Sequence, residues 1–290
     1  MIKIDNKKIS INKIKNEFNN LIDTNNSSNK FWKSHSKEII DEFLNQNPIN
    51  FLRFNTIGKS MFVGRRVKYI YYEYLKLLKN KKKFINLTNT LRCNNFGNPK
   101  RFPLNLISQN TNSNMIHQAY HLLKLKEETN INIENIHNIF EFGGGYGALC
   151  KIFFNSGFKG NYFIYDLPIM SIIQKFWISN SQFNTNCNIF LTTETKDLEV
   201  INESFKNKNN LFISNWALSE SPIHLRNQFE KFFNNYNYLS LAIQDKFQDV
   251  DNKKYLINLK EYLFKDCGIF LFDKKIRHIK NSSYVYGIKI

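Results

Sequence analysis

Residues 140–148 read Phe-Glu-Phe-Gly-Gly-Gly-Tyr-Gly-Ala, and they decide the fold class of this 290-residue chain. A short apolar run, 136–142, leads into the glycines, and residues 148–154 then follow a helical pattern. A strand that ends in glycines before a helix lets a ligand approach the backbone closely and meet a helix N-terminus. The segment therefore predicts a buried strand, a ligand-binding glycine loop and a helix, in that order.

An acidic residue stands at the end of the next predicted strand, 162–165. Asp166 follows Gly143 by 23 residues, a spacing at which a carboxylate reaches the ribose of a nucleotide-like ligand in a doubly wound sheet. The alternative is a glycine-rich turn in which Asp166 caps the helix that begins near Pro168. We favour the ligand site, because strand, loop, helix, strand and acid all occur in order.

The rest of the chain alternates between strand-like and helical patterns. The strand-like runs are 189–191, 211–214 and 239–244, and the helical stretches are 168–179, 197–206 and 222–235. Such alternation predicts a parallel sheet with helices on both faces. The last two runs, 269–272 and 284–290, are separated by a polar turn and predict an antiparallel hairpin. We expect an α/β, Rossmann-like sheet of seven strands, five parallel plus the hairpin, with a mainly helical N-terminal region.

The glycines alone do not identify the ligand. Gly143, Gly145 and Ala148 also satisfy the dinucleotide fingerprint, so an NAD-dependent oxidoreductase is one alternative. Glu141, two residues before the first glycine, is acidic where NAD-binding strands are usually apolar. A carboxylate at this place suits the ammonium group of S-adenosylmethionine, which we therefore favour as the cofactor.

Two further segments give the chain a family resemblance. Residues 165–168 read Tyr-Asp-Leu-Pro, and residues 212–220 contain a strand that leads into Ser-Glu. With the glycine loop, these segments resemble class I S-adenosylmethionine-dependent O-methyltransferases and, more closely, the bacterial sugar O-methyltransferase family. The resemblance covers about 115–290. It implies a seven-stranded methyltransferase fold and transfer of a methyl group to a hydroxyl of a sugar or glycan-type acceptor.

The resemblance also implies a set of cofactor-binding residues at the carboxyl ends of the first strands. They are Glu141, Gly143, Gly145, Tyr146 and Gly147 on the methionine side, Asp166 at the ribose, Leu167 near the adenine, and Asn215 and Trp216 beside the transferring methyl group. Plant-type O-methyltransferases with the same Asp-Leu-Pro element carry a catalytic His-Asp-Trp where residues 214–216 here read Ser-Asn-Trp. That base is missing, and no cluster of acids suggests a divalent metal.

One candidate base lies on a helix that the pattern predicts from 112 to about 128. Methyl transfer to an unactivated hydroxyl needs aligned reactants and a base that takes the proton. His117, Tyr120 and His121 share one face of this helix, close in sequence to the glycine loop. We assign His117 and His121 as catalytic candidates and Tyr120 as a substrate contact. The alternative is the solvated stripe of an amphipathic helix.

A second candidate base lies after the fourth strand. Glu220 and His224 are four residues apart and meet on one face if a single helix contains both, so that the carboxylate orients the imidazole. The alternative is a helix N-terminus, with Pro222 in the first turn and Glu220 favoured by the helix dipole. The other histidines, His35, His137 and His278, have no comparable neighbours, and we interpret them as incidental.

The net charge of +17 at first suggests a nucleic-acid partner. Residues 1–130 carry +14 of it and residues 131–290 only +3, and seven of the 41 basic residues are Arg, the side chain best suited to phosphate and base contacts. The excess thus lies outside the segment that carries the chemistry. We favour a small-molecule or glycan acceptor, while a nucleic-acid methyltransferase that docks through its basic N-terminal region stays an alternative.

The chain divides into two predicted parts. Residues 1–110 form a helical region that serves as a substrate lid or in homo-oligomerisation, and residues 111–290 form the S-adenosylmethionine-binding domain. No run approaches the ~20 apolar residues that span a bilayer, the start lacks a signal peptide's apolar core, and the four cysteines form no CxxC pair. A cytoplasmic enzyme is expected. A non-catalytic scaffold that retains the cofactor fold is a further alternative.

Overall fold

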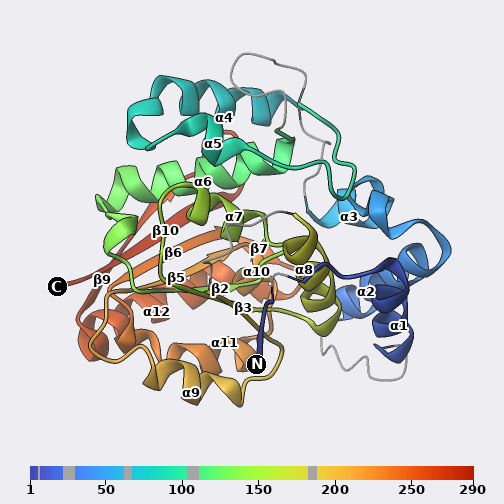
Figure 1. The fold of residues 1–290 in the computed structure, drawn as a ribbon. Helices are drawn as coiled ribbons and strands as arrows, with labels where there is room; N and C mark the ends of the chain where they lie inside the picture. Colours follow the sequence, from blue (N-terminus) through green and yellow to red (C-terminus); the bar gives the residue numbers. More distant parts are fainter. Residues whose placement is uncertain (6, 22–29, 62–66, 103–110, 182–187) are drawn as a thin grey trace.

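The computed structural model describes residues 1–5, 7–21, 30–61, 67–102, 111–181 and 188–290. At its centre is an eight-stranded sheet in the order β1-β4-β3-β2-β5-β6-β10-β9, with helices on both faces (Figure 1). The strands are β1 (Ile2–Lys3), β2 (Asn138–Phe142), β3 (Asn161–Tyr165), β4 (Asn188–Thr192), β5 (Asn210–Asn215), β6 (Tyr238–Gln244), β9 (Ile269–Lys275) and β10 (Ser282–Lys289). A separate hairpin consists of β7 (Lys246–Phe247) and β8 (Val250–Asp251).

Five neighbouring strands, β4, β3, β2, β5 and β6, run parallel. Strand β10 pairs antiparallel with both β6 and β9. The predicted Rossmann-like sheet of five parallel strands with a C-terminal antiparallel hairpin is therefore confirmed. The structure adds to this sheet one strand that the sequence does not predict, because Ile2 and Lys3 pair antiparallel with Leu191 and Phe190 at the sheet edge.

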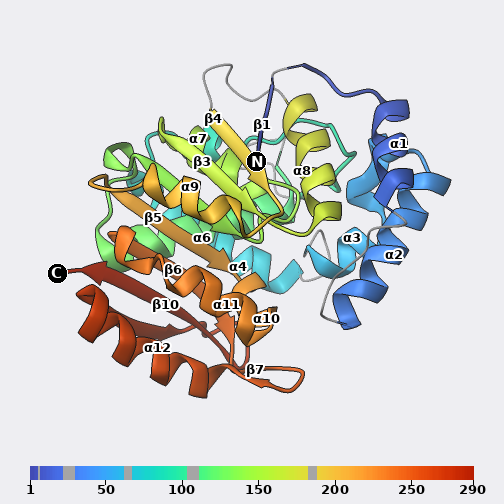
Figure 2. The same cartoon turned by 90° about the horizontal axis from the view of Figure 1, so that it is seen from below.

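The helices cover the two faces of the sheet unequally. They are α1 (Ile11–Leu21), α2 (Lys30–Asn45), α3 (Asn55–Ser60), α4 (Val67–Lys79), α5 (Leu87–Leu91), α6 (Ser113–Thr129), α7 (Ala148–Asn155), α8 (Pro168–Asn180), α9 (Asp197–Glu203), α10 (Ala217–Glu220), α11 (Ile223–Glu230) and α12 (Asn252–Cys267). One face carries α9, α11 and α12, seen from their side in Figure 2. The other carries α6, α7 and α8 and, packed on these, the helices before them.

Strand β2 shows how the two faces are built. All five of its residues are buried. Ile139 belongs to the core beneath α6, α7 and α8, whereas Phe140 and Phe142 belong to the core over α9, α11 and α12. Because side chains alternate between faces along a strand, Glu141 shares the first face with Ile139. A strand that is buried on both faces reads as a continuous apolar run, which is why these strands are predictable.

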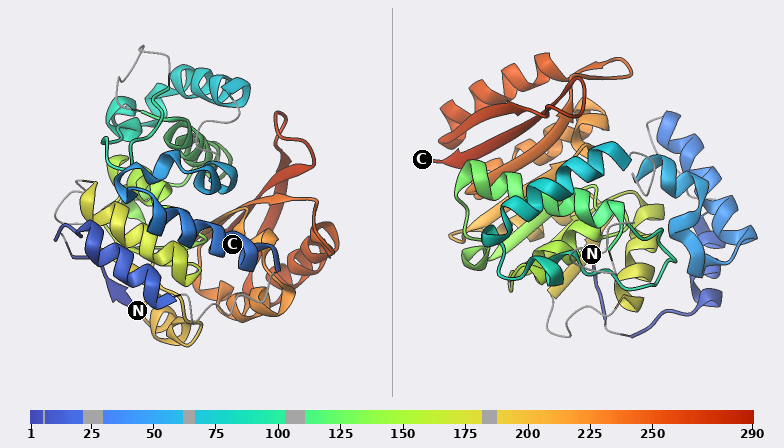
Figure 3. Two further views of the ribbon diagram at one scale, coloured as in Figure 1. Left: turned by 90° about the vertical axis from the view of Figure 1, so that its right-hand side faces the viewer. Right: turned by 90° about the horizontal axis from the view of Figure 1, so that it is seen from above.

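The N-terminal helices share a hydrophobic core with the sheet. Helix α1 packs on α8, and α4 packs on α6; Ile14 and Phe18 of α1 lie in the same core as Phe176 of α8. Figure 3 shows α1 to α3, in blue, at one end of the molecule, and α4 and α5, in cyan, packed over α6. The division into 1–110 and 111–290 stays a prediction about roles, since the packing is continuous across it.

Asparagines stand at the amino ends of the parallel strands. Asn138, Asn161, Asn188 and Asn210 begin β2, β3, β4 and β5. Asn161 Nδ2 donates to Asn138 Oδ1 at 2.9 Å, and Asn138 Nδ2 donates to Asn210 Oδ1 at 2.8 Å. These amides hydrogen-bond to one another at this edge of the sheet. In a parallel α/β sheet a ligand binds at the opposite edge, where the carboxyl ends of the strands meet.

The helices differ from the prediction in two places. The stretch 222–235 is not one helix, because α10 begins earlier and α11 ends at Glu230. Pro222 separates these two helices with an extended backbone, φ −62° and ψ 148°. Helix α12 is not predicted at all, since it buries only Asn252, Leu259, Leu263 and Cys267 and its apolar stripe is therefore thin.

Candidate functional site

The glycine loop lies at the carboxyl end of β2 and turns into α7. Gly143, Gly145 and Gly147 have φ of +83°, +56° and +95°, in the left-handed region that favours glycine. A Cβ on Gly143 would lie 2.0 Å from Ala217 Cβ. On Gly145 it would come no nearer to any described atom than 3.8 Å, at Met61 Sδ. The loop is thus tightly packed at its first glycine and open at its third.

Asp166 lies beside this loop at the end of β3 and is partly buried. Its Oδ1 accepts a 2.8 Å hydrogen bond from the Leu167 backbone N–H, and its Oδ2 accepts one of 2.7 Å from Gln174 Nε2. Gln174 also donates to the Gly145 carbonyl oxygen at 3.0 Å, so one amide on α8 joins the acid to the loop. Burial raises the pKa of Asp166 to about 7, although the donors around its carboxylate lower it.

Glu141 lies beneath the loop with only 3% of its surface exposed. Its Oε2 accepts a 2.9 Å hydrogen bond from Tyr162 Oη and lies 3.3 Å from the position that a Cβ on Gly144 would take. Burial raises the pKa of Glu141 to about 8, and the charge of Asp166 raises it further against the hydrogen bond from Tyr162. A cationic ligand group at the loop would favour its charged form.

Tyr146 does not face the ligand side. Its ring is 1% exposed and packs edge-on against Trp177 of α8, with 4.8 Å between ring centroids. Only the backbone of Tyr146 therefore borders the loop, and the cofactor contact predicted for this residue would involve its backbone rather than its ring. The ring anchors α8, which carries Gln174, to the loop.

Asn215 and Trp216 follow β5, next to the glycine loop. Trp216 has φ +75°, a strained conformation for a side chain of this size. Its backbone N–H donates to the Ala242 carbonyl oxygen at 2.7 Å, which holds this turn in place. Asn215 Nδ2 donates to Gln118 Oε1 at 3.1 Å. The loop after β5 is therefore tied to α6.

The α6 face that the sequence singled out is buried. His117, Tyr120 and His121 are 3%, 6% and 2% exposed, so the alternative of a solvated stripe is wrong. His117 Nδ1 lies 2.9 Å from each carboxylate oxygen of Glu73 on α4, and His121 Nε2 lies 3.1 Å from His117 Nε2. His278 Nε2 lies 2.7 Å from Glu73 Oε1. The Tyr120 ring packs 5.5 Å from that of His278.

Sequence reasoning missed two members of this cluster, which we call the Glu73 network: Glu73, His117, His121 and His278. The interpretation of His278 as incidental is wrong, because the β9–β10 connection brings it to a carboxylate 205 positions away. Glu73 carried one signal that could have revealed it. It is the single acid between Glu42 and Glu127, and it stands inside an apolar, aromatic helix.

The surroundings of the Glu73 network stabilise the charged form of Glu73 and disfavour the charged form of His121. Burial alone would raise the pKa of Glu73, but the charge of His117 and the hydrogen bonds from His117 and His278 outweigh it and hold the pKa at about 2. Burial, and next the charge of His117, lower the pKa of His121 well below its ordinary value. A positive charge on His121 itself is therefore disfavoured.

Glu220 and His224 do not share a helix face. Helix α10 ends at Glu220, Pro222 is extended, and His224 lies exposed on α11. The predicted pair is wrong for that reason. Glu220 instead accepts hydrogen bonds from Gln244 and from Trp32 of α2, and burial raises its pKa.

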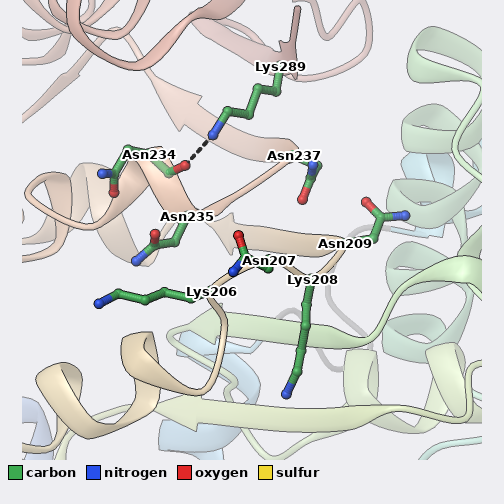
Figure 4. Close-up of a pocket in the computed structure, with 8 residues that line it drawn as sticks. All are labelled: Lys206, Asn207, Lys208, Asn209, Asn234, Asn235, Asn237 and Lys289. Atoms are coloured by element: carbon green, nitrogen blue, oxygen red, sulfur yellow. Dashed lines mark hydrogen bonds between the residues drawn. The ribbon is translucent and has the colours of Figure 1, made fainter.

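The opposite edge of the sheet carries a pocket with different chemistry. It is lined by Lys206, Asn207, Lys208, Asn209, Asn234, Asn235, Asn237 and Lys289 (Figure 4). Lys289 Nζ donates to the Asn234 carbonyl oxygen at 2.5 Å. The lining contains no carboxylate or imidazole to act as a base, and it lies at the amino ends of β5 and β6, away from the glycine loop.

The described ranges contain neither a metal-binding cluster nor a membrane-spanning helix. Within them, no group of three or more His, Cys, Asp or Glu side chains could hold a metal ion. No helix within them combines the length and the apolar character needed to cross a membrane.

Comparisons with known proteins reach only as far as the fold. No protein-family model matches the chain, and none of the curated proteins does. Similar solved structures include the Methanococcus jannaschii fibrillarin pre-rRNA processing protein, with 14% identity over 55% of this chain and 69% of that one and a TM-score of 0.41. The methyltransferase domain of a bacterial CtHen1 has 9% identity over 59% and 97%, with a TM-score of 0.43.

A third similar structure is the magnesium protoporphyrin IX methyltransferase ChlM from Synechocystis PCC 6803, solved with S-adenosylmethionine. It has 12% identity over 60% of this chain and 80% of that one, and a TM-score of 0.42. At this similarity the matches identify no acceptor, and they give no support for the sugar O-methyltransferase family. The fold class rests on the strand order and directions described above.

Proposed function

We propose that this protein is an S-adenosylmethionine-dependent O-methyltransferase. The observation that carries the proposal is the placement of Asp166 beside the open Gly145 at the carboxyl ends of β2 and β3. A partly buried carboxylate next to a backbone that a ligand can approach suits a ribose with two hydroxyl donors. Asp166 accepts from the Leu167 backbone N–H and from Gln174 Nε2. The backbone N–H groups of Gly144 and Gly145 also face its carboxylate, which places the acid against the glycine loop.

The other cofactor-binding residues fit the same ligand by kind and position. Bound here, S-adenosylmethionine would supply a methyl group on a positively charged sulfur. The Glu141 carboxylate, which lies beneath the loop, would attract the positively charged ammonium group of the cofactor. Leu167 would border the adenine beyond Asp166. Asn215 and Trp216 would border the methyl end, because the turn after β5 packs on the glycine loop through Ala217.

We place the acceptor between this turn and α6. The rings near Trp216 include His121 at 6.4 Å, and Tyr284 lies 5.4 Å from His121. Aromatic faces with polar edges suit a sugar or another small hydroxylated molecule. In this proposal the N-terminal region contributes to the acceptor side, since Glu73 comes from α4.

Calorimetry on the purified protein tests the cofactor. S-adenosylhomocysteine should bind and NADH should not; the reverse result would contradict the proposal and favour the oxidoreductase. Asp166→Ala should weaken binding about tenfold or more, since hydrogen bonds to a charged group contribute about 1.5–3 kcal/mol each. Asp273→Ala, an acid on β9 whose partner is the exposed Lys260, is the matched control and should bind as the wild type does.

A transfer assay tests the acceptor class. Radiolabelled S-adenosylmethionine should label monosaccharides or oligosaccharides from a panel, and the product should resist mild alkali as an ether does. Label in RNA or DNA instead, together with an affinity for nucleic acid that falls steeply with salt, would contradict the small-molecule or glycan acceptor proposed here and favour the nucleic-acid alternative.

A further inference from the structure

Two buried polar atoms lie unpaired at the end of the Glu73 network. His121 Nδ1 and Tyr284 Oη have no hydrogen-bond partner within the described residues, and the two side chains are 2% and 3% exposed. Their rings meet edge to face, with centroids 5.4 Å apart. Leaving such groups unpaired costs stability, so native proteins keep them mainly where a ligand, a water or a catalytic role accounts for them.

The unpaired atoms lie near the proposed methyl-transfer end of the cofactor site. The ring of His121 is 6.4 Å from that of Trp216. Gln118, on the same helix, holds Asn215 at 3.1 Å. A hydroxyl group that met both orphaned atoms would therefore stand beside the turn after β5.

The hydrogen-bond chain determines which atom of His121 can accept a proton. The Glu73 carboxylate accepts from His117 Nδ1, so in neutral His117 the Nε2 atom carries the lone pair. His121 Nε2 must then donate to it, across 3.1 Å. His121 Nδ1 is left with its lone pair and no partner, as a base requires.

We propose that Glu73, His117 and His121 form a proton relay in which His121 Nδ1 is the general base for the acceptor hydroxyl. Tyr284 Oη donates a hydrogen bond to the same hydroxyl oxygen and positions it. The inference rests on the proposed function, because it needs a methyl donor at the glycine loop. Glu73 and His117 act through His121 and are positioning residues.

The transfer step forms one carbon–oxygen bond and breaks one carbon–sulfur bond. The acceptor oxygen forms its bond to the methyl carbon while the carbon–sulfur bond breaks and leaves its electron pair on sulfur. The hydroxyl proton moves to His121 Nδ1, and the Nε2 proton of His121 passes to His117 Nε2. The positive charge lost by sulfur then resides on the His117 imidazolium, held by the Glu73 carboxylate.

The surroundings of the relay favour this direction. Around it lie His278 from the β9–β10 connection, Tyr284 from β10 and Tyr120 from α6. His278 donates to Glu73 and so helps to keep the carboxylate charged. Charge on His121 itself is disfavoured by burial, and passing it to His117 places it 2.9 Å from an anion.

Nitrogen NMR of ¹⁵N-histidine protein, free and saturated with S-adenosylhomocysteine, tests the relay without an identified acceptor. At pH 8 we expect a protonated Nδ1 on His117 and a bare Nδ1 on His121. On lowering the pH, one shared step should protonate His121 Nδ1 and His117 Nε2 together. A protonated His121 Nδ1 at pH 8, or two independent titrations, would overturn the proposal.

Variants separate the relay from folding and from cofactor binding. Glu73→Gln should move the shared titration step down by about one pH unit or more, since it removes the adjacent negative charge. The control is His137→Gln, because His137 is exposed and lies at the opposite edge of the sheet; it should leave the step unchanged. Both variants should bind S-adenosylhomocysteine within about twofold of the wild type. An unmoved step in Glu73→Gln, or loss of binding in it, would overturn the relay. If the wild type failed to bind S-adenosylhomocysteine, that result would instead contradict the proposed function.

With an acceptor from the transfer assay, the rates give a second readout. His121→Gln and Glu73→Gln should lower kcat about a hundredfold or more, the range of general-base catalysis, with the KM for S-adenosylmethionine unchanged. His137→Gln should keep the wild-type rate. A rise in KM with kcat retained would overturn the relay and assign these residues to binding.

Discussion

Gln174 on α8 donates a 2.7 Å hydrogen bond to Asp166 at the end of β3. The same Nε2 atom donates to the Gly145 carbonyl oxygen, so this amide fixes the acid relative to the loop. Its Oε1 is buried with no partner within the described residues. The two hydrogen bonds from Nε2 give Gln174 the role of positioning the acid against the loop.

Replacing Gln174 with Leu should weaken cofactor binding most at low pH. The hydrogen bond from Gln174 lowers the pKa of Asp166, so its loss should raise that pKa above about 7 and leave more of the acid neutral. Calorimetry with S-adenosylhomocysteine should show a loss of about three- to tenfold at pH 7 and a smaller loss at pH 9. Ser179→Ala on the same helix is the control. An equal loss at both pH values would show that only shape matters.

Features of the fold that depend on residues close together in the sequence are predictable, whereas contacts between residues far apart in the sequence are not. The strands and the glycine loop are local patterns, because a parallel strand buried on both faces is a continuous apolar run. The contact between Glu73 and His278 joins residues far apart in the chain, and no local pattern encodes it. The predicted pairing of Glu220 with His224 is wrong for a local reason, because Pro222 has an extended backbone and separates the helix that ends at Glu220 from the one that carries His224.

Cofactor affinity should itself depend on pH through Asp166. Ribose hydroxyls bind the charged carboxylate, and this group has a pKa of about 7 in the free protein. Affinity for S-adenosylhomocysteine should therefore rise by up to about tenfold per pH unit below 7 and level off above it. Glu141, with a pKa of about 8, adds a second rise toward pH 8.

Isosteric amides separate the two acids. Asp166→Asn should remove the rise below pH 7, and Glu141→Gln should remove the one toward pH 8. Calorimetry from pH 5.5 to 9 in buffers of matched ionic strength measures both. A flat wild-type profile would contradict ribose binding by the Asp166 carboxylate.

Glu73 should contribute stability that disappears in acid. Its pKa is about 2 in the folded protein against an ordinary value of 4.5, so its contribution is fully present above pH 4.5 and is lost as the pH falls from 4.5 toward 2. Glu73→Gln should lower the free energy of unfolding at pH 7 by about 3 kcal/mol. Urea denaturation at pH 7, 4.5 and 3.5 should show the gap between wild type and variant shrinking. A gap independent of pH would mean that packing, and not charge, accounts for it.

The first and third glycines of the loop should respond differently to alanine. Both have positive φ, so each substitution costs about 1 kcal/mol from the backbone alone. Gly143→Ala adds a collision, because its Cβ would lie 2.0 Å from that of Ala217, and the melting temperature should fall by several degrees more than that of Gly145→Ala. Gly145→Ala has room for its methyl group among the described residues and should stay folded.

The same methyl group on Gly145 would occupy the space through which a ligand reaches the backbone. Gly145→Ala should therefore retain most of its stability yet bind S-adenosylhomocysteine at least about tenfold more weakly, a loss of about 1.4 kcal/mol. Differential scanning calorimetry and titration calorimetry on the two variants separate the effects. If Gly145→Ala bound as the wild type does, the open side of the loop would not be the side that holds the cofactor, and the assignment of Asp166 to the ribose would fail with it.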